Sequence, residues 1–141
     1  MDIKTLCSAV KDNLSHLKGA RSEDDHRINY AKVNEFRDAI LKQLSSETNK
    51  YNWESEQKHS GRLEKDSVDI LGQAPHKPKW IIEIDATRTD QVSQKLLSRL
   101  ALWGKKDAIQ YVAILYPDAH SVAFPKSRTE LKFTKTFNFV I

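Results

Sequence analysis

Two short apolar segments decide the fold of this chain: DSVDILG at residues 66–72 and KWIIEIDATR at residues 79–88. Each is predicted to be a β-strand that carries acids among aliphatic residues. Side chains two apart on a strand share a face. The second strand therefore points Glu83 and Asp85 to one side and its apolar residues to a core on the other, and Asp69 lies between apolar residues of the first. Neighbouring carboxylates repel each other, and a bound cation relieves that repulsion.

The composition is that of one globular domain, residues 1–141, with 39% hydrophobic residues. Neither a membrane-length apolar run nor a signal-peptide pattern occurs, so we expect a cytoplasmic protein without a membrane partner. The one cysteine, Cys7, excludes an internal disulfide and a cysteine-based zinc cluster. No glycine-rich phosphate loop is present, so no organic cofactor is expected. A net charge of +4 mildly favours an anionic partner.

The first part of the chain predicts two helices. Apolar residues at three- and four-residue steps indicate an N-terminal helix within residues 1–19, with Asp2 as its cap and Gly19 as its stop. A second helix is expected at about residues 26–44, capped within the SEDD segment at residues 22–25. Its apolar stripe passes through either Phe36 or Arg37, and Glu35 lies off that stripe.

The rest of the chain predicts strands around one more helix. Alternation at Tyr51, Trp53 and Ser55 indicates a half-buried strand, and Gly61 a bend before the strand that holds Asp69. After the strand at residues 79–86, a helix begins near Thr87, Thr89 or Asp90. The apolar stripe expected on that helix is Val92, Leu96, Leu100 and Trp103, and the polar side is Gln91, Lys95, Ser98 and Arg99.

A nearly continuous apolar run at residues 109–116 predicts a strand buried on both faces. Strand, helix and strand in this order predict a right-handed parallel crossover. Alternating residues at 126–141 predict a last amphipathic strand. The fold class expected is α/β, with a central mixed β-sheet flanked by helices.

This order of parts resembles the PD-(D/E)xK nuclease core, a superfamily that includes many restriction endonucleases and Holliday-junction resolvases. The resemblance covers residues 33–117: a helix with Glu35, a polar strand, the VDILG strand, the E-x-D strand, a helix and an apolar strand. It implies a restriction-endonuclease-like core and a divalent-metal-dependent deoxyribonuclease that uses Mg²⁺ or Mn²⁺ to cleave DNA. Oxygen-only ligands favour these ions over zinc or copper.

The resemblance also implies roles for single residues. Asp69 and Glu83 would bind the metal with the backbone carbonyl of Ile84, and Glu35 resembles the helical glutamate near a second metal. Asp85 stands where the family has its catalytic lysine. Lys95 on the following helix is the candidate to supply that lysine, and Gln91 or Gln94 resembles a helical glutamine of several branches. A second ion recruited by Asp85 would partly replace the missing charge.

A DNA partner would meet basic residues around these acids. The nucleic-acid-binding residues expected are Arg88, Gln91, Arg99 and Lys79, and a second basic cluster is Lys126, Arg128, Lys132 and Lys135. Phosphate contacts of this kind give salt-dependent affinity with little sequence preference. A homodimer would supply the two sites that duplex cleavage needs, and the first helix is the surface expected to form it.

Two other interpretations fit the same residues. The chain could keep the nuclease fold without catalysis and bind nucleic acid or a protein partner, or it could be a protein-interaction domain. The acids could also form a solvated charge network with Arg88, Lys95 or Arg99. Asp69 lying beyond a side chain's reach of Glu83, or either acid buried in a salt link with no open cavity beside it, would end the nuclease interpretation.

Overall fold

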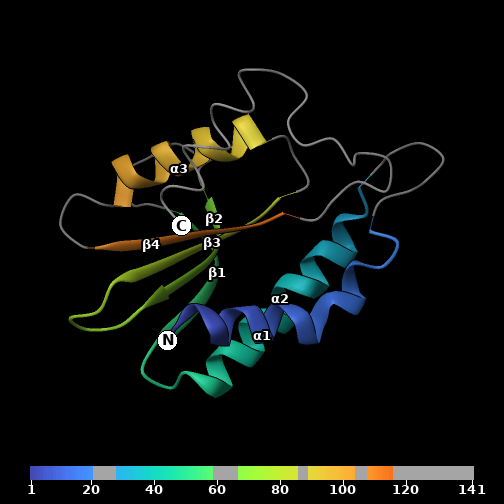
Figure 1. Ribbon diagram of the computed structural model, residues 1–141, viewed down its shortest axis with the longest axis horizontal. Coiled ribbons are helices and arrows are strands. Elements are labelled where there is room, and N and C mark those ends of the chain that lie inside the picture. The colour runs from blue at the N-terminus through green and yellow to red at the C-terminus, as the bar shows by residue number, and fades with distance from the viewer. Residues whose placement is uncertain (21–27, 59–66, 86–88, 104–107, 116–141) are drawn as a thin grey trace.

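The computed structural model describes residues 1–20, 28–58, 67–85, 89–103 and 108–115 (Figure 1). This part of the chain is mixed α/β, with three α-helices, one 3₁₀ helix and a four-stranded sheet. The elements are α1 (Ile3–Asn13), η1 (Leu14–Leu17), α2 (Tyr30–Glu47), β1 (Asn52–Lys58), β2 (Ser67–Gln73), β3 (Lys79–Asp85), α3 (Thr89–Trp103) and β4 (Ile109–Leu115).

The sheet has the order β1-β2-β3-β4. The first three strands form an antiparallel meander, and β4 lies parallel to β3 along its whole length. The parallel pairing predicted for the strand–helix–strand unit is therefore confirmed. In Figure 1, α1 and α2 cover one face of the sheet and α3 covers the other.

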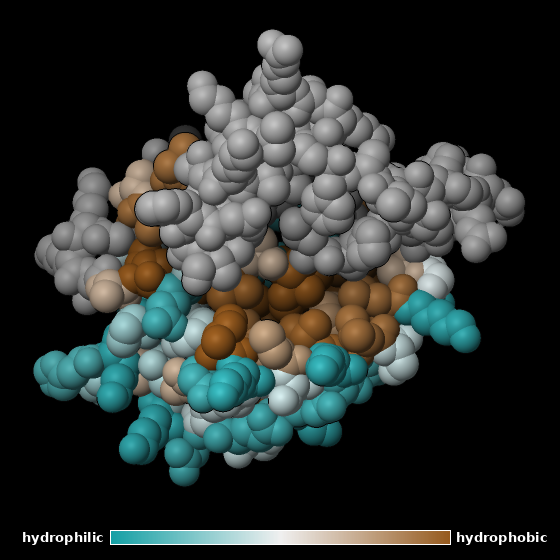
Figure 2. All heavy atoms as spheres, in the orientation of Figure 1, coloured by the Kyte–Doolittle hydropathy of each residue, from teal (hydrophilic) through white to brown (hydrophobic). Residues whose placement is uncertain are grey.

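Both faces of the sheet are packed. Trp80, Ile82 and Ile84 of β3 join the larger core cluster, with residues of α1 and α2, as the alternation predicted. Ile81 and Leu96 belong to a second cluster beneath α3. Figure 2 shows hydrophilic side chains along the outer side of α1 and α2, and hydrophobic ones toward the sheet.

The two N-terminal helices begin at side-chain caps. Asp2 caps α1 by accepting a 2.9 Å hydrogen bond from the Thr5 amide, as predicted. Helix α2 begins later than predicted, at Tyr30, because Asn29 is its cap. Its buried residues include Phe36, which settles the choice between Phe36 and Arg37. Leu6 and Ala9 of α1 are buried in the chain's own core, so the α1 surface left for a dimer is smaller than the sequence suggested.

Helix α3 differs most from the sequence prediction. Leu96 is buried as expected, but Leu100 of the same predicted stripe is 37% exposed, and Arg99 is only 5% exposed. The prediction that Arg99 lies on a solvent-facing polar side is wrong. The face turned to the sheet carries cations because it covers the acids of β3.

Several predictions fall outside the described residues: the SEDD segment, the bend at Gly61, Arg88, and the strand at 126–141 with its basic cluster. Among the helices that are described, none is long and apolar enough to cross a membrane.

Gly72 of β2 lies directly beneath the indole of Trp53, its partner on β1. A Cβ at Gly72 would be 2.6 Å from Cη2 and 2.7 Å from Cε3 of that ring. The indole cannot easily give way, because its Nε1 donates a 2.7 Å hydrogen bond to Thr48. We therefore expect Gly72→Ala to lower the free energy of unfolding by about 1–3 kcal/mol in urea titration. The cost of Gly72→Ala should be smaller when it is measured in a Trp53→Leu background, and an unchanged stability of Gly72→Ala itself would contradict the packing.

Candidate metal centre

Strands β2 and β3 separate at one end of the sheet. Their pairing runs from Gly72 with Trp80 to Ile70 with Ile82, although β2 begins at Ser67 and β3 continues to Asp85. Strand β3 stays paired with β4 as far as Asp85, and β2 stays paired with β1 as far as Ser67, so the two pairs of strands diverge from each other here. We call this region, residues 67–69 and 83–85, the acidic fork. Backbone groups that face the fork need side-chain partners, since buried backbone donors and acceptors are nearly always bonded.

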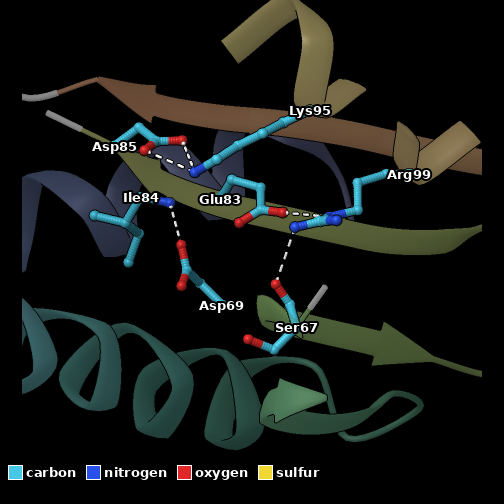
Figure 3. A network of polar contacts seen from close by, with 7 residues as sticks. All are labelled: Ser67, Asp69, Glu83, Ile84, Asp85, Lys95 and Arg99. Carbon is cyan, nitrogen blue, oxygen red and sulfur yellow. Dashed lines mark hydrogen bonds and ion pairs between the residues drawn. The ribbon is translucent and has the colours of Figure 1, made fainter. Parts of the chain in front are cut away.

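Asp69 supplies one of these partners. Its Oδ2 accepts a 2.7 Å hydrogen bond from the backbone amide of Ile84, across the fork (Figure 3). In antiparallel pairing, the N–H and C=O of one residue point to the same neighbour. The Ile84 carbonyl is therefore expected on the side of β3 that faces Asp69, where the sequence placed a metal ligand.

Glu83 and Arg99 form a buried ion pair in the fork. Arg99 Nε donates to Glu83 Oε1 at 2.8 Å, and Arg99 Nη2 donates to the carbonyl of Ser67 at 3.0 Å. Glu83 is 2% exposed. The guanidinium thus joins β3 to β2 where the ladder between them has ended (Figure 3).

Asp85 and Lys95 form a second, more accessible pair. Lys95 Nζ lies 2.8 Å from Oδ1 and 2.7 Å from Oδ2 of Asp85, and the lysine side chain is 38% exposed. Lys95 and Arg99 share a helix face because they are four residues apart. Glu83 and Asp85 share a strand face because they are two apart. The pairs form in opposite sequence order: Glu83 pairs with Arg99, and Asp85 pairs with Lys95.

The fork holds more negative than positive charge, with three carboxylates against two cations. Burial first, and then the negative charge of Asp69, raise the pKa of Glu83 to about 7 against the opposing effect of Arg99 and Lys95. Burial also raises the pKa of Tyr111, with Glu83 and Asp85 adding to the effect. A divalent cation in the fork would relieve this excess charge.

Tyr111 is the site residue that the sequence prediction missed. It lies on β4 opposite Ile81 and is buried in the cluster beneath α3. Ile81 shares its face of β3 with Glu83 and Asp85, whose charges contribute to the raised pKa of the Tyr111 phenol. The signal in the sequence was a single tyrosine within the aliphatic run IQYVAIL, at a position that alternation puts on the acid-bearing face.

The structure places Asp69 on the Ile84 amide next to Glu83, and Lys95 on Asp85, so these four predicted residues lie around the end of β3. Glu35 is not part of this network: its side chain is 66% exposed, and its Oε2 lies 4.0 Å from His16 Nδ1 of η1. Lys79 begins the seven-residue strand that Asp85 ends, roughly 20 Å away along β3. The side chain of Gln91 is not among those described, and Gln94 is exposed.

The donor set suits a hard ion that keeps other ligands. No group of three or more His, Cys, Asp or Glu side chains in the described residues is arranged to hold a metal. Two carboxylates and the Ile84 carbonyl are enough for Mg²⁺, which usually retains water and binds substrate phosphate through one or two protein carboxylates. The excess negative charge in the fork agrees with this fit.

The salt link of Glu83 meets one of the two conditions that would argue against a nuclease. The other condition concerns an open cavity beside the acids. Of two cavities lined by described residues, of about 610 and 660 Å³, neither lies beside the acids, since both lie at the other end of β3, around Lys77 and Pro78. Whether a metal ion can displace Arg99 from Glu83 therefore decides between a nuclease and a module without catalysis.

Comparison with protein-family models, curated proteins and solved structures finds no significant match to this chain. The resemblance to the PD-(D/E)xK nucleases therefore stays a prediction. The acidic fork and the order of the elements around it are the features that bear on function.

Proposed function

We propose that this chain is a divalent-metal-dependent deoxyribonuclease with a restriction-endonuclease-like core. The observation that carries the proposal is the acidic fork, where Asp69 accepts a hydrogen bond from the Ile84 amide next to Glu83, and where Lys95 of α3 pairs with Asp85. The surrounding order also supports it: a helix, a three-stranded meander, a second helix and a parallel strand. This is the order that suggested the resemblance in the sequence.

Asp69, Glu83 and the Ile84 carbonyl would hold Mg²⁺ or Mn²⁺. When bound, such an ion polarises phosphate oxygen and lowers the pKa of its water. Asp85 holds the Lys95 ammonium by two hydrogen bonds, at the strand position where the family has its lysine. Helix α3 therefore supplies, through Lys95, the positive charge that β3 lacks at this position. Lys95 would bind the phosphate of DNA.

A second candidate function is a nuclease-like module without catalysis that binds nucleic acid or a protein. The buried Glu83–Arg99 pair favours it, because it neutralises one proposed metal ligand from within the chain. Such a module would bind DNA in a salt-sensitive way through its basic residues and would show no response to divalent metal.

Cleavage of supercoiled plasmid in Mg²⁺, Mn²⁺ or EDTA tests these alternatives. We expect metal-dependent nicking that falls at least about 100-fold in Asp69→Asn, because a lost metal ligand removes several kcal/mol of transition-state stabilisation. Asp38→Asn, an exposed acid of α2, is the matched control and should cleave normally. Salt-sensitive DNA binding without nicking would contradict the nuclease and support the module. Neither binding nor nicking would indicate a protein-interaction domain.

A further inference from the structure

Arg99 occupies the gap between the two diverging strands. Its guanidinium bonds the carboxylate of Glu83 on β3 and the carbonyl of Ser67 on β2 at the same time. The side chain comes from α3 above the sheet and is nearly inaccessible to water (Figure 3). It therefore reaches the fork from the face of the sheet that α3 covers.

The two cations of α3 have different partners. Lys95 neutralises Asp85, an acid that is not among the proposed metal ligands, and it remains partly exposed. Arg99 neutralises Glu83, which is one of those ligands. Only the Arg99 pair therefore conflicts with metal binding.

A divalent ion on Glu83 would lie close to the guanidinium on the same carboxylate. Like charges repel strongly where water is excluded, and Glu83 and Arg99 are both buried. Once an ion neutralises Glu83, the arginine's charge is no longer needed there. A released guanidinium is suited to phosphate, because its planar N–H groups match two phosphate oxygens.

We infer that Arg99 and the divalent ion compete for Glu83: Arg99 holds the fork without metal and turns to a DNA phosphate when the ion binds. This inference rests on the proposed function and adds a positioning residue to it. Metal loading and the phosphate contact are thereby coupled, since one side chain takes part in both.

The test follows the arginine itself by NMR, in the ¹⁵N-labelled full chain. In EDTA, the Arg99 Nε–H should exchange with water at least about tenfold more slowly than exposed arginines, because it is buried and bonded. Saturating Mg²⁺ should abolish that protection while it shifts the backbone amide of Ile84, which reports binding. The Arg99 Nε–H signal is identified as the one that is missing from the spectrum of Arg99→Gln.

A second readout is the affinity for Mn²⁺ measured by calorimetry. Arg99→Gln removes the competing charge and should tighten binding about tenfold, a gain of about 1.4 kcal/mol. Arg37→Gln on α2 is the control and should leave the affinity unchanged. Unchanged or weaker Mn²⁺ binding in Arg99→Gln would overturn the competition, and the wild-type NMR titration decides it if that variant does not fold.

The plasmid assay separates the inference from the proposed function. Metal-dependent nicking with a protected Arg99 Nε–H in Mg²⁺ would overturn the inference and leave the nuclease standing. Loss of Arg99 Nε–H protection in Mg²⁺ without plasmid nicking would support the competition between Arg99 and the ion, and would contradict the nuclease. An Ile84 amide that does not respond to Mg²⁺ would overturn the inference outright.

Discussion

Arg99→Met is expected to lower the free energy of unfolding by about 3–5 kcal/mol at pH 8. The substitution leaves the Glu83 carboxylate buried without its cation, and it removes the donor to the Ser67 carbonyl. Methionine fills much of the same volume, so the loss reports charge and hydrogen bonding more than packing. Urea unfolding followed by circular dichroism measures the difference.

Two further variants show whether the buried charge is the cause. Arg99→Met combined with Glu83→Gln should recover most of the loss, because no uncompensated carboxylate remains. Lys95→Met is the comparison on the same helix face, and its cost should be smaller than that of Arg99→Met, because the Lys95 side chain is 38% exposed although that of Asp85 is only 8% exposed. Equal costs for Arg99→Met and Lys95→Met would show that burial does not distinguish the two pairs.

The stability of the metal-free protein is expected to fall as pH rises from 4.5 to 8. The pKa of Glu83 is raised from 4.5 to about 7, chiefly by burial and then by the charge of Asp69. The folded chain therefore holds this proton more tightly than the unfolded chain does. The resulting stabilisation is fully present below pH 4.5 and is lost as pH rises through 7, a change of about 3 kcal/mol.

Urea titrations in EDTA at a series of pH values measure this contribution, with Glu83→Gln as the reference. Glutamine cannot ionise, so the difference between wild type and variant isolates the one group from other titrating residues. The loss should be concentrated between pH 4.5 and 8. Parallel pH profiles for the two proteins would show that Glu83 titrates alike in the folded and unfolded chains.

The pH dependence also links the two predictions. At pH 5, Glu83 in Arg99→Met takes up a proton, so the variant leaves no buried charge behind. The cost of the substitution should therefore be smaller at pH 5 than at pH 8. A cost independent of pH would mean that the interaction with Ser67, and not the charge on Glu83, governs the stability of the fork.

The sequence by itself determined the faces of β3, including the shared face of Glu83 and Asp85, and the parallel pairing of β3 with β4. Alternation in KWIIEID fixed which residues of β3 enter the larger core, and the spacing of Glu83 and Asp85 put both on one face. The strand–helix–strand order fixed the parallel pairing of β3 and β4. These features are local because they depend on the periodicity of one segment or on the length of one connection.

Only the tertiary structure decided which face of α3 is buried and where β2 leaves β3. Apolar and charged residues are spread around α3, so its own pattern does not select Arg99 for burial over Leu97. The selection comes from β3, whose acids attract the cations of the helix that covers them. The fork likewise arises from the divergence of two strands, which lets Asp69 reach the amide of Ile84 and Arg99 reach Ser67. Contacts between segments far apart in the chain set both features, and no periodicity within one segment encodes them.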